Sequence, residues 1–336
     1  MKILISTDAW YPQVNGVVKT IQFTKECLER CGHEVIIANP TGRICFRMPF
    51  TKDVRSPLWV SASSLMASVE WADCVHISTE GLIGLATRRA CCRLGFRFTT
   101  AYHTDIPGFL LKNLGFGARA AIAYLKWFHS KSSCLMATTQ GNVTELKNKG
   151  FSSPIKIWSR GVDTDLFRPR PRPRSGSGRI RLVYCGRISP EKGIADFLEL
   201  DNRYDKTVIG DGVELPMMRL QHPNVRFTGF LHGRQLADEL ASHDIFVFPS
   251  KFDTFGLVVI EAMSCGLPVA CYDVRGPGEI VRDAQRAGCA NDDLAQAVKS
   301  CIDLIGGNSA RSHVLQHYTW ESATAQFLSN LVPKKP

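Results

Sequence analysis

The sequence lacks any apolar run approaching the roughly 18 residues that a membrane-spanning helix needs, which argues against an integral membrane protein. It also lacks a Cys-x-x-Cys pair, and among its 12 cysteines only Cys91 and Cys92 are adjacent. A chain of 336 residues does not need disulfides to hold its core, so we expect reduced thiols, no metal cluster and a cytoplasmic protein. The apolar start, residues 2–6, is too short for a signal peptide and predicts a first strand.

Several binding motifs are also missing. The sequence has no Gly-x4-Gly-Lys-Ser/Thr phosphate loop, and no zinc-finger, RRM, KH or helix-turn-helix pattern that would support nucleic-acid binding. The composition, with 44% hydrophobic and 21% charged residues, is that of an ordinary globular protein and excludes large-scale disorder. The length predicts two or three domains.

The positive charge is concentrated in the first half of the chain. The net charge is +10: residues 1–167 contribute +8, residues 168–178 add four arginines and no acid, and residues 179–336 carry −2. This excess indicates an acidic partner for the first half, namely an anionic membrane surface, nucleic acid or a phosphorylated substrate. The alternative is that the charge serves solubility alone.

Short apolar runs alternate with amphipathic stretches along the chain. The expected strands are 2–6, 34–38, 74–77, 98–102, 134–138, 155–157, 180–185, 207–209, 225–227, 245–248 and 268–270. The expected helices are 17–30, 64–71, 83–94, 118–131, 233–242, 257–264, 292–303 and 310–330. The alternation predicts an α/β protein with two doubly wound domains, 1–167 and 179–315, joined by an Arg/Pro/Gly/Ser linker at 168–178. With two facing domains, the cleft between them is the expected ligand site.

Two loops after expected strands of the first domain carry candidate polar contacts. Asn15 and Gly16 end the loop after the first strand, where glycine permits close approach of a phosphate or sugar and free helix amides favour an anion. A plain turn is the alternative. His103 and Asp105 follow strand 98–102, where a polar pair suits substrate contact. The alternative for His103 is a structural histidine bonded to a backbone carbonyl.

Two loops of the second domain are more informative. Arg187 and Lys192 lie in a loop bounded by Gly186 and Gly193, and two cations with loop amides suit a diphosphate better than a solvated surface. Further on, Asp253 lies after strand 245–248 and Glu261 lies in the following helix, with seven residues between them. The surroundings are apolar, where carboxylates are rarely left unpaired, and an acid placed there suits the hydroxyls of a ribose.

Together and in order, these motifs resemble the retaining family 4 nucleotide-sugar glycosyltransferases of the GT-B fold. The resemblance rests on Gly186-Arg-Ile-Ser-Pro-Glu-Lys-Gly193, Gly210-Asp-Gly212, the acid-x7-Glu segment, Arg160-Gly-Val-Asp-Thr-Asp-Leu-Phe167, and Asp8 to Val17. The opening segment and Tyr102-His-Thr-Asp105 are most similar to the branch that glycosylates membrane lipids, such as sulfoquinovosyl-diacylglycerol synthases and phosphatidylinositol mannosyltransferases. The resemblance implies two Rossmann-like domains facing an interdomain cleft, with a C-terminal helix, 316–333, that returns to the first domain.

The resemblance also implies a catalytic role for four residues. His103 would lie near the anomeric carbon and orient the sugar. Arg187 and Lys192 would bind the donor diphosphate and stabilise charge on the leaving group. Asp253 would contact sugar hydroxyls, with a reach about one methylene shorter than the glutamate that is commoner at this position.

Further donor contacts follow from the same resemblance. Gly16 would approach the donor phosphate or sugar, the backbone of Phe255, Gly256 and Leu257 would contact sugar and phosphate, and Glu261 would hold the ribose. No second carboxylate is identifiable as a nucleophile, which favours same-face attack in a retaining enzyme, with the leaving phosphate taking the acceptor proton. The resemblance implies no cofactor and no metal.

One pattern does look like a metal motif. Asp163-Thr-Asp165 has the spacing of an Asp-x-Asp site, but two short side chains in a junction loop would need further oxygen partners to hold a cation. We therefore expect no metal there.

The expected acceptor and membrane surface lies in the first domain. Arg119 and Lys126 are seven residues apart and so share one helical face, and Lys112 and Trp127 extend the basic, aromatic stretch. Such a stretch fits docking on an anionic leaflet. A core-facing helix with a solvated basic face is the alternative. Asn15 and Asp105 complete this expected set.

The leading hypothesis is a cytoplasmic enzyme, peripheral on the inner face of the membrane. It transfers a hexosyl group with retention from a UDP- or GDP-sugar to a membrane lipid or lipid-linked acceptor, and has no nucleic-acid partner. A transferase for a soluble or polysaccharide acceptor and a sugar-nucleotide epimerase of the same architecture are the alternatives.

Overall fold

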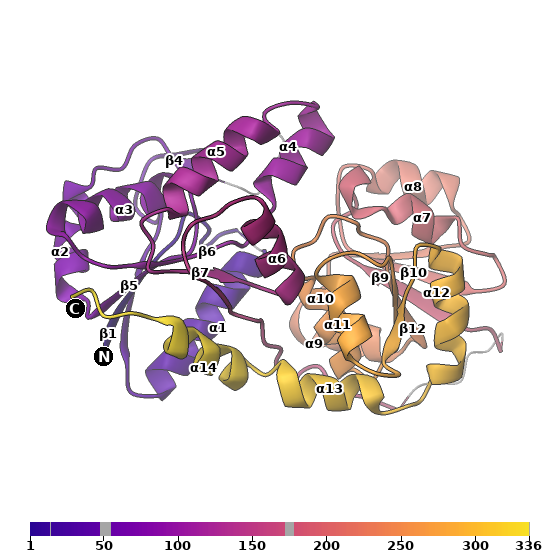
Figure 1. Ribbon diagram of the computed structural model, residues 1–336. Helices are drawn as coiled ribbons and strands as arrows, with labels where there is room; N and C mark the ends of the chain where they lie inside the picture. The colour runs from indigo at the N-terminus through magenta and orange to yellow at the C-terminus, as the bar shows by residue number, and fades with distance from the viewer. Residues whose placement is uncertain (14, 48–54, 172–177, 336) are drawn as a thin grey trace. The chain divides into compact units, whose positions relative to one another are not determined.

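The computed structural model describes residues 1–13, 15–47, 55–171 and 178–335, and they form two compact units. The first unit comprises Met1–Arg160 with Trp320–Pro336, and the second comprises Gly161–Thr319 (Figure 1). The first boundary therefore falls earlier than the expected one after residue 167. Most of the expected linker, 168–178, lies outside the described residues.

The first unit is built on a six-stranded sheet in which every neighbouring pair is parallel. In sheet order its strands are β2 (Glu34–Ala38), β1 (Lys2–Ser6), β5 (Cys74–Ile77), β6 (Thr99–Ala101), β7 (Cys134–Ala137) and β8 (Ile155–Ile157). Its helices are α1 (Gly16–Arg30), α2 (Ser63–Trp71), α3 (Leu82–Leu94), α4 (Ile106–Leu114), α5 (Ala118–His129), α6 (Gln140–Asn148) and α14 (Trp320–Asn330). The chain reverses its direction of strand addition between β1 and β5, so the loops after these two strands border the switch point of the sheet.

The residues of β1 alternate between two cores. Leu4 packs with α2 and α3 on one face of the sheet, whereas Ile3 and Ile5 pack with α1 and α14 on the other. All three side chains are fully buried, and burial of each contributes about 1.5–3 kcal/mol. Because successive side chains of a strand point to opposite faces, a continuous apolar strand requires helices on both sides of the sheet.

The second unit contains another six-stranded parallel sheet. Its order is β11 (Arg226–Gly229), β10 (Asp205–Ile209), β9 (Arg181–Cys185), β12 (Ile245–Phe248), β13 (Val269–Cys271) and β14 (Gly288–Ala290). Its helices are α7 (Ile194–Leu198), α8 (Leu215–Gln221), α9 (Gly233–Ala241), α10 (Leu257–Ser264), α11 (Pro277–Asp283), α12 (Leu294–Cys301) and α13 (Ser309–His317), with 3-10 turns η1 (Pro190–Lys192) and η2 (Ile302–Leu304). The switch point lies between β9 and β12. The expected α/β class with two doubly wound sheets is confirmed.

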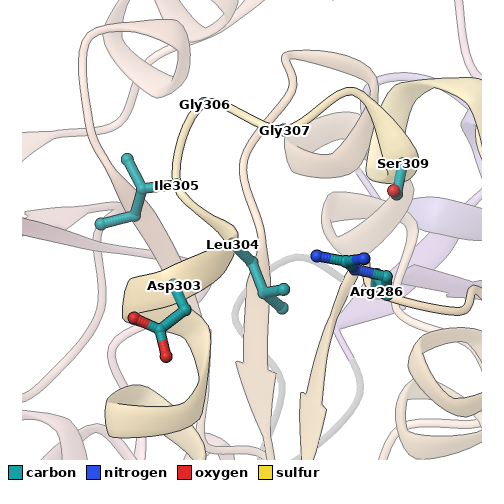
Figure 2. Close-up of a pocket in the computed structure, with 7 residues that line it drawn as sticks. All are labelled: Arg286, Asp303, Leu304, Ile305, Gly306, Gly307 and Ser309. Atoms are coloured by element: carbon teal, nitrogen blue, oxygen red, sulfur yellow. The ribbon is translucent and has the colours of Figure 1, made fainter.

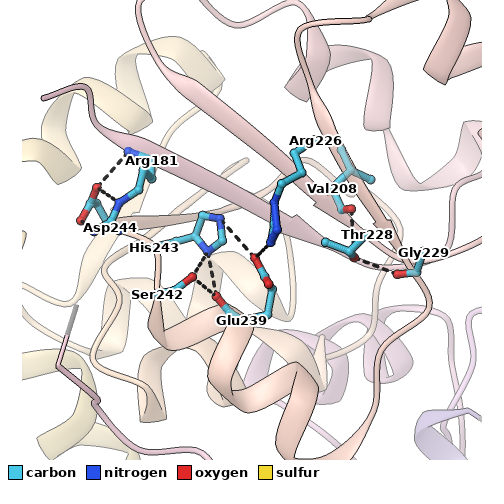
Figure 3. A network of polar contacts seen from close by, with 9 residues as sticks. All are labelled: Arg181, Val208, Arg226, Thr228, Gly229, Glu239, Ser242, His243 and Asp244. Atoms are coloured by element: carbon cyan, nitrogen blue, oxygen red, sulfur yellow. Dashed lines mark hydrogen bonds and ion pairs between the residues drawn. The ribbon is translucent and has the colours of Figure 1, made fainter. Parts of the chain in front are cut away.

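Strand β9 shows the same alternation as β1. Val183 packs with α9, α10 and α13, while Leu182 and Tyr184 pack with α7 and α12 on the opposite face. The beginning of this strand is fixed by a polar network (Figure 3). Asp244, just before β12, accepts from the backbone N–H of Arg181 at 2.9 Å and from its guanidinium at 2.9 and 3.0 Å. This network secures the amino-terminal edge of the sheet.

Some elements differ from the expectation. A short antiparallel hairpin, β3 (Cys45–Arg47) and β4 (Arg55–Pro57), was not predicted, nor were α4, α6, α7, α8, α11 and β14. The helix expected over 310–330 is two helices, since the carbonyl of Tyr318 accepts from the N–H of Val162 and Thr319 pairs with Val162 as an isolated bridge. After this break Trp320 begins α14 and stacks on Phe23 of α1, with ring centroids 4.8 Å apart.

Candidate active site

The switch point of the second sheet brings two predicted loops together. Loop 186–193 follows β9 and loop 249–256 follows β12, and these two strands are neighbours. In doubly wound sheets, ligands bind outside the carboxyl ends of the strands at this point. The expected donor-binding segments therefore lie where the topology favours a ligand.

Lys192 and Asp253 meet across these loops. The Lys192 ammonium donates to both oxygens of the Asp253 carboxylate, at 2.8 and 2.9 Å. Burial alone would raise the pKa of the Asp253 carboxyl, but the charge and hydrogen bond of Lys192, with Ser250 and Arg187, hold that pKa below its usual value. Asp253 thus remains an ionised hydrogen-bond acceptor, and the two groups form a preassembled pair.

Glycines let the adjacent loops approach this pair closely. A Cβ on Gly210, after β10, would lie 1.9 Å from the carbonyl oxygen of Gly186, and one on Gly212 would lie 2.0 Å from that of Ile188. A Cβ on Gly193 would lie 2.6 Å from the carbonyl oxygen of Pro249. These separations are too short for any side chain, so the Gly210-Asp-Gly212 segment can only be built from glycine at those two positions.

Arg187 is held less tightly than Lys192. Its side chain is half exposed and lies 3.6 Å from the carboxylate of Glu191, one turn along the loop. The hydroxyl of the buried Tyr184 donates to the backbone carbonyl of Arg187 at 2.7 Å and fixes the main chain beneath it. The guanidinium therefore stands on a rigid base and can reach an anion in solvent.

Helix α10 (Leu257–Ser264) begins four residues after Asp253. Gly256, with φ of +83°, is the residue before the helix, and Leu257 is its first residue. The N–H of Val259 donates to the carbonyl of Gly256 at 2.9 Å, whereas those of Leu257 and Val258 precede the regular hydrogen bonds of the helix. Phe255 is buried against Tyr318, with centroids 5.7 Å apart. Glu261 lies in the second turn and is buried, with an exposed fraction of 7%. The amides suit an anion, and the acid suits hydroxyl groups.

The carboxyl edge of the first sheet holds a buried basic pair. His103 follows β6, Arg160 follows β8, and Nη2 of Arg160 lies 2.7 Å from Nδ1 of His103. Burial, then the charges of Arg160 and His76, lower the pKa of His103 well below its usual value. His103 is therefore a neutral imidazole. Arg160 was not predicted as a site residue, although it begins the Arg160–Phe167 segment that carries the resemblance.

Asn15 and Asp105 act as helix caps. Oδ1 of Asn15 accepts from the N–H groups of Val17 and Val18 at 3.0 and 3.1 Å, and Gly16 is the first residue of α1. Asp105 accepts from the N–H of Gly108 at 3.1 Å and from the Tyr102 hydroxyl at 3.0 Å. These contacts order the two loops at the start of α1 and α4.

Helix α5 presents the expected basic face. Leu125 and Phe128 are buried, whereas Arg119 and Lys126 are exposed and Trp127 has an exposed fraction of 47%. The side chain of Lys112, in α4, lies outside the described residues. Leu111 of α4 and Phe116 of the turn between α4 and α5 are exposed as well.

The Asp163-Thr-Asp165 segment forms a turn. Oδ1 of Asp163 accepts from the backbone N–H groups of Asp165 and Leu166 at 3.1 and 2.9 Å. In the described residues, no group of three or more His, Cys, Asp or Glu side chains is arranged to hold a metal ion. Asp163 thus has a structural use in the junction loop.

A hollow of about 350 Å³ lies elsewhere in the second unit (Figure 2). It is bounded by Arg286, Asp303, Leu304, Ile305, Gly306, Gly307 and Ser309. Its lining contains none of the predicted donor residues. One exposed arginine beside a helix start does not provide the paired cation and acid found at Lys192 and Asp253.

Comparison with known proteins identifies the family. A family model described as Glycosyltransferase Family 4 matches residues 14–166, and one described as Glycosyl transferases group 1 matches residues 179–306. A GDP-mannose-dependent alpha-mannosyltransferase of Mycolicibacterium smegmatis is 30% identical over 84% of this chain and 82% of its own length. The chain belongs to glycosyltransferase family 4. The resemblance seen in the sequence is confirmed, and the chain is a nucleotide-sugar glycosyltransferase.

Two further similarities cover nearly the whole of this family 4 enzyme. The sulfoquinovosyl transferase SQD2 of Arabidopsis thaliana is 25% identical over 94% of this chain and 70% of its own. The crystal structure of HepE from Anabaena, in complex with UDP, superimposes with a TM-score of 0.74 at 17% identity, covering 98% and 99% of the two chains. At this identity the structural likeness shows the shared GT-B fold.

Proposed function

We propose that this family 4 glycosyltransferase transfers a hexosyl group, with retention of configuration, from a guanosine or uridine diphosphate sugar to a lipid or lipid-linked acceptor at an anionic membrane surface. The observation that carries the donor part is the Lys192–Asp253 pair at the switch point, with the half-exposed Arg187 beside it. A diphosphate would lie against the two cations and the first amides of α10. Asp253 would accept from sugar hydroxyls and Glu261 from the ribose.

GDP-mannose is the first donor to test. Three relatives named GDP-mannose-dependent alpha-mannosyltransferases are 27–30% identical over 84–98% of this chain. GDP-mannose carries its sugar in the α configuration, so an alpha-mannosyl product preserves it. Arg187, Lys192 and the α10 amides would stabilise charge on the departing diphosphate, which is the main catalytic contribution we assign.

The lipid part of the proposal rests on the first unit. Its sequence carries most of the positive charge, and α5 exposes Arg119, Lys126 and Trp127. None of the helices in the described part of the chain is long and apolar enough to cross a bilayer. We therefore propose a peripheral contact in which cations meet anionic headgroups and Trp127 reaches the interface.

Thermal unfolding of the full chain with GDP, GDP-mannose, UDP and UDP-glucose, each with and without EDTA, tests the donor. We expect a selective rise in Tm for one base that EDTA does not change, corresponding to about 2.7 kcal/mol at a ligand concentration one hundred times Kd. The anomeric configuration of the product, read by NMR, tests retention. Absence of a shift with every nucleotide would overturn the donor site, and loss of the shift in EDTA would overturn metal independence.

A further inference from the structure

The contact between Arg160 and His103 fixes the position of a proton. A guanidinium has only N–H donors, so at 2.7 Å from Nη2 the Nδ1 atom of His103 must be the acceptor. A neutral imidazole carries one proton, which must then be on Nε2. The ring is thereby a donor at Nε2, and the opposite tautomer would place two N–H groups against each other.

Arg160 is itself held in place. Nη1 donates to the carbonyls of Trp158 and Ser159 at 2.9 and 3.0 Å, and the guanidinium lies 4.8 Å from the centroid of the Trp158 ring. The same indole meets His103 edge-on at 5.5 Å. The exposed fractions of Arg160 and His103 are 5% and 9%. The arginine, the indole and the imidazole therefore form one buried cluster.

The charges around this cluster also favour a neutral His103 ring. Among the side chains that the structure describes, no carboxylate pairs with Arg160, and its burial lowers the pKa of the guanidinium to about 9. The groups that act on the His103 ring are Arg160, after β8, and His76, on β5. Burial and Arg160 lower the pKa of His76 to about 3, so His76 is neutral as well. A protonated His103 would face a cation that no acid neutralises.

We propose that Arg160 is a positioning residue that holds His103 as the neutral Nε2–H tautomer, so that the ring donates a hydrogen bond to the hexosyl group of the donor. The inference rests on the proposed function, together with the role beside the transferred sugar that the family resemblance implies for His103. Positive charge develops at the anomeric centre during glycosyl transfer. A neutral donor orients the sugar without opposing that charge, whereas an imidazolium would repel it.

The tautomer can be measured without substrate. Long-range ¹H–¹⁵N spectra of histidine-labelled full chain, with His103 assigned from His103→Asn, should show a proton on Nε2 alone and no titration between about pH 5.5 and 8.5. In Arg160→Met the ring should gain the Nδ1–H form or titrate with a pKa closer to the ordinary 6.5. Arg160→Lys retains a cationic donor and should preserve the neutral ring.

Arg88 provides a matched control. It is also buried, stacks on Trp127 at 4.2 Å, and donates to the carbonyls of Trp127 and Phe128. Arg88→Met removes a comparable arginine with no contact to His103, so it should leave the His103 spectrum unchanged. An equal spectral change in Arg88→Met would mean that general loosening of the unit, not the Arg160 contact, sets the tautomer.

Kinetics separate positioning from a structural role. Arg160→Met should lower kcat for hexosyl transfer at least about tenfold, with a smaller change in donor KM. When His103→Asn is already present, adding Arg160→Met should lower kcat little further, because both changes remove the same interaction. If the losses of kcat caused by Arg160→Met and His103→Asn were additive in the double variant, the inference would be overturned. A wild-type His103 protonated at Nδ1 would also overturn it, and that measurement does not require Arg160→Met to fold. If His103 had the expected tautomer but the protein transferred no sugar, the proposed function would be wrong. The effect of Arg160 on the tautomer would still be supported.

Discussion

The ammonium group of Lys192 and the carboxylate of Asp253 are joined by two hydrogen bonds across the loops that follow β9 and β12. The two side chains have exposed fractions of 25% and 21%, so water only partly screens them. In this arrangement the lysine does two things: it keeps a largely buried acid ionised, and it places a cation at the switch point of the sheet. Each role gives a separate prediction.

The loss of stability on replacing Lys192 should depend on pH. Because the pKa of Asp253 is lowered in the folded state, the pair stabilises the fold above the ordinary pKa near 3.9, and this stabilisation is lost as the pH falls through the lowered value. Lys192→Met should therefore lower the free energy of unfolding by about 1–3 kcal/mol at pH 7 and by less at pH 3. Urea unfolding at both pH values measures this. An equal penalty at both would show that the ion pair is not its source, and Lys299→Met, on the exposed face of α12, is the control.

The same lysine should matter for transfer, and so should Glu261. We expect Lys192→Ala and Glu261→Ala each to lower the transfer rate at least about tenfold, or roughly 1.4 kcal/mol, through lost phosphate and ribose contacts. Initial rates over a range of donor concentrations should show the Glu261→Ala effect mainly in donor KM. Glu199→Ala, at an exposed position of the same unit, should behave as wild type. Wild-type rates in both site variants would remove this site assignment.

Gly210→Ala should damage the donor site through the backbone. The new Cβ would lie 1.9 Å from the carbonyl oxygen of Gly186, and φ at this position is +141°. The loop after β9 must shift, so nucleotide affinity measured by calorimetry should fall together with Tm. Gly306→Ala is the matched control, because Gly306 also has a positive φ but a Cβ added there would have no neighbouring atom within 4 Å. Equal losses in the two variants would assign the effect to backbone strain alone.

The sequence predicted the two sheets well because their strands are continuous apolar runs bounded by polar turns. Strands such as 2–6 and 245–248 occur with the expected bounds. Short elements were missed where the pattern is too brief to show a period: α7 has five residues, and the β3–β4 hairpin pairs three residues with three. The break between α13 and α14 was missed because it depends on Val162, which is distant in sequence and pairs with Thr319.

For the site, the sequence located the segments but not the partners. Glycine spacing and the acid-x7-Glu pattern identified the loops of Lys192 and Asp253, since both follow strands. Which side chains pair could not be read from either loop alone, because the contact depends on β9 and β12 being neighbours. Asp105 was predicted as an acceptor contact and is also a helix cap. Arg160 begins one of the motifs that carry the resemblance, but it was not predicted as a site residue because only the fold brings it to His103.

Asp244 offers a test at the opposite edge of the second sheet. It accepts three hydrogen bonds from Arg181, and in a separate group nearby Glu239 of α9 contacts Arg226 and His243 (Figure 3). Asp244→Asn keeps the size of the side chain but loses its charge, so we expect a fall of about 1–3 kcal/mol in the free energy of unfolding. Since the network is at the amino ends of the strands, nucleotide affinity of the folded fraction should not change. A weakened affinity would mean that the two edges are coupled.

The exposed face of α5 gives the last prediction. Arg119 and Lys126 lie on one side of the helix, with Trp127 partly exposed beside them. Each cation near an anionic surface contributes about 1 kcal/mol, so Arg119→Gln with Lys126→Gln should weaken binding to phosphatidylglycerol-containing vesicles about thirtyfold while leaving nucleotide affinity intact.

Lys147→Gln with Lys299→Gln removes the same charge from other exposed positions and controls for overall electrostatics. Vesicle flotation, with and without added salt, measures the membrane binding of both double variants. If the control weakens binding as much as the α5 variant, net charge alone attracts the enzyme to membranes. If neither does, or if the wild type does not float, the acceptor is met in solution and the basic face of α5 is a solvated surface.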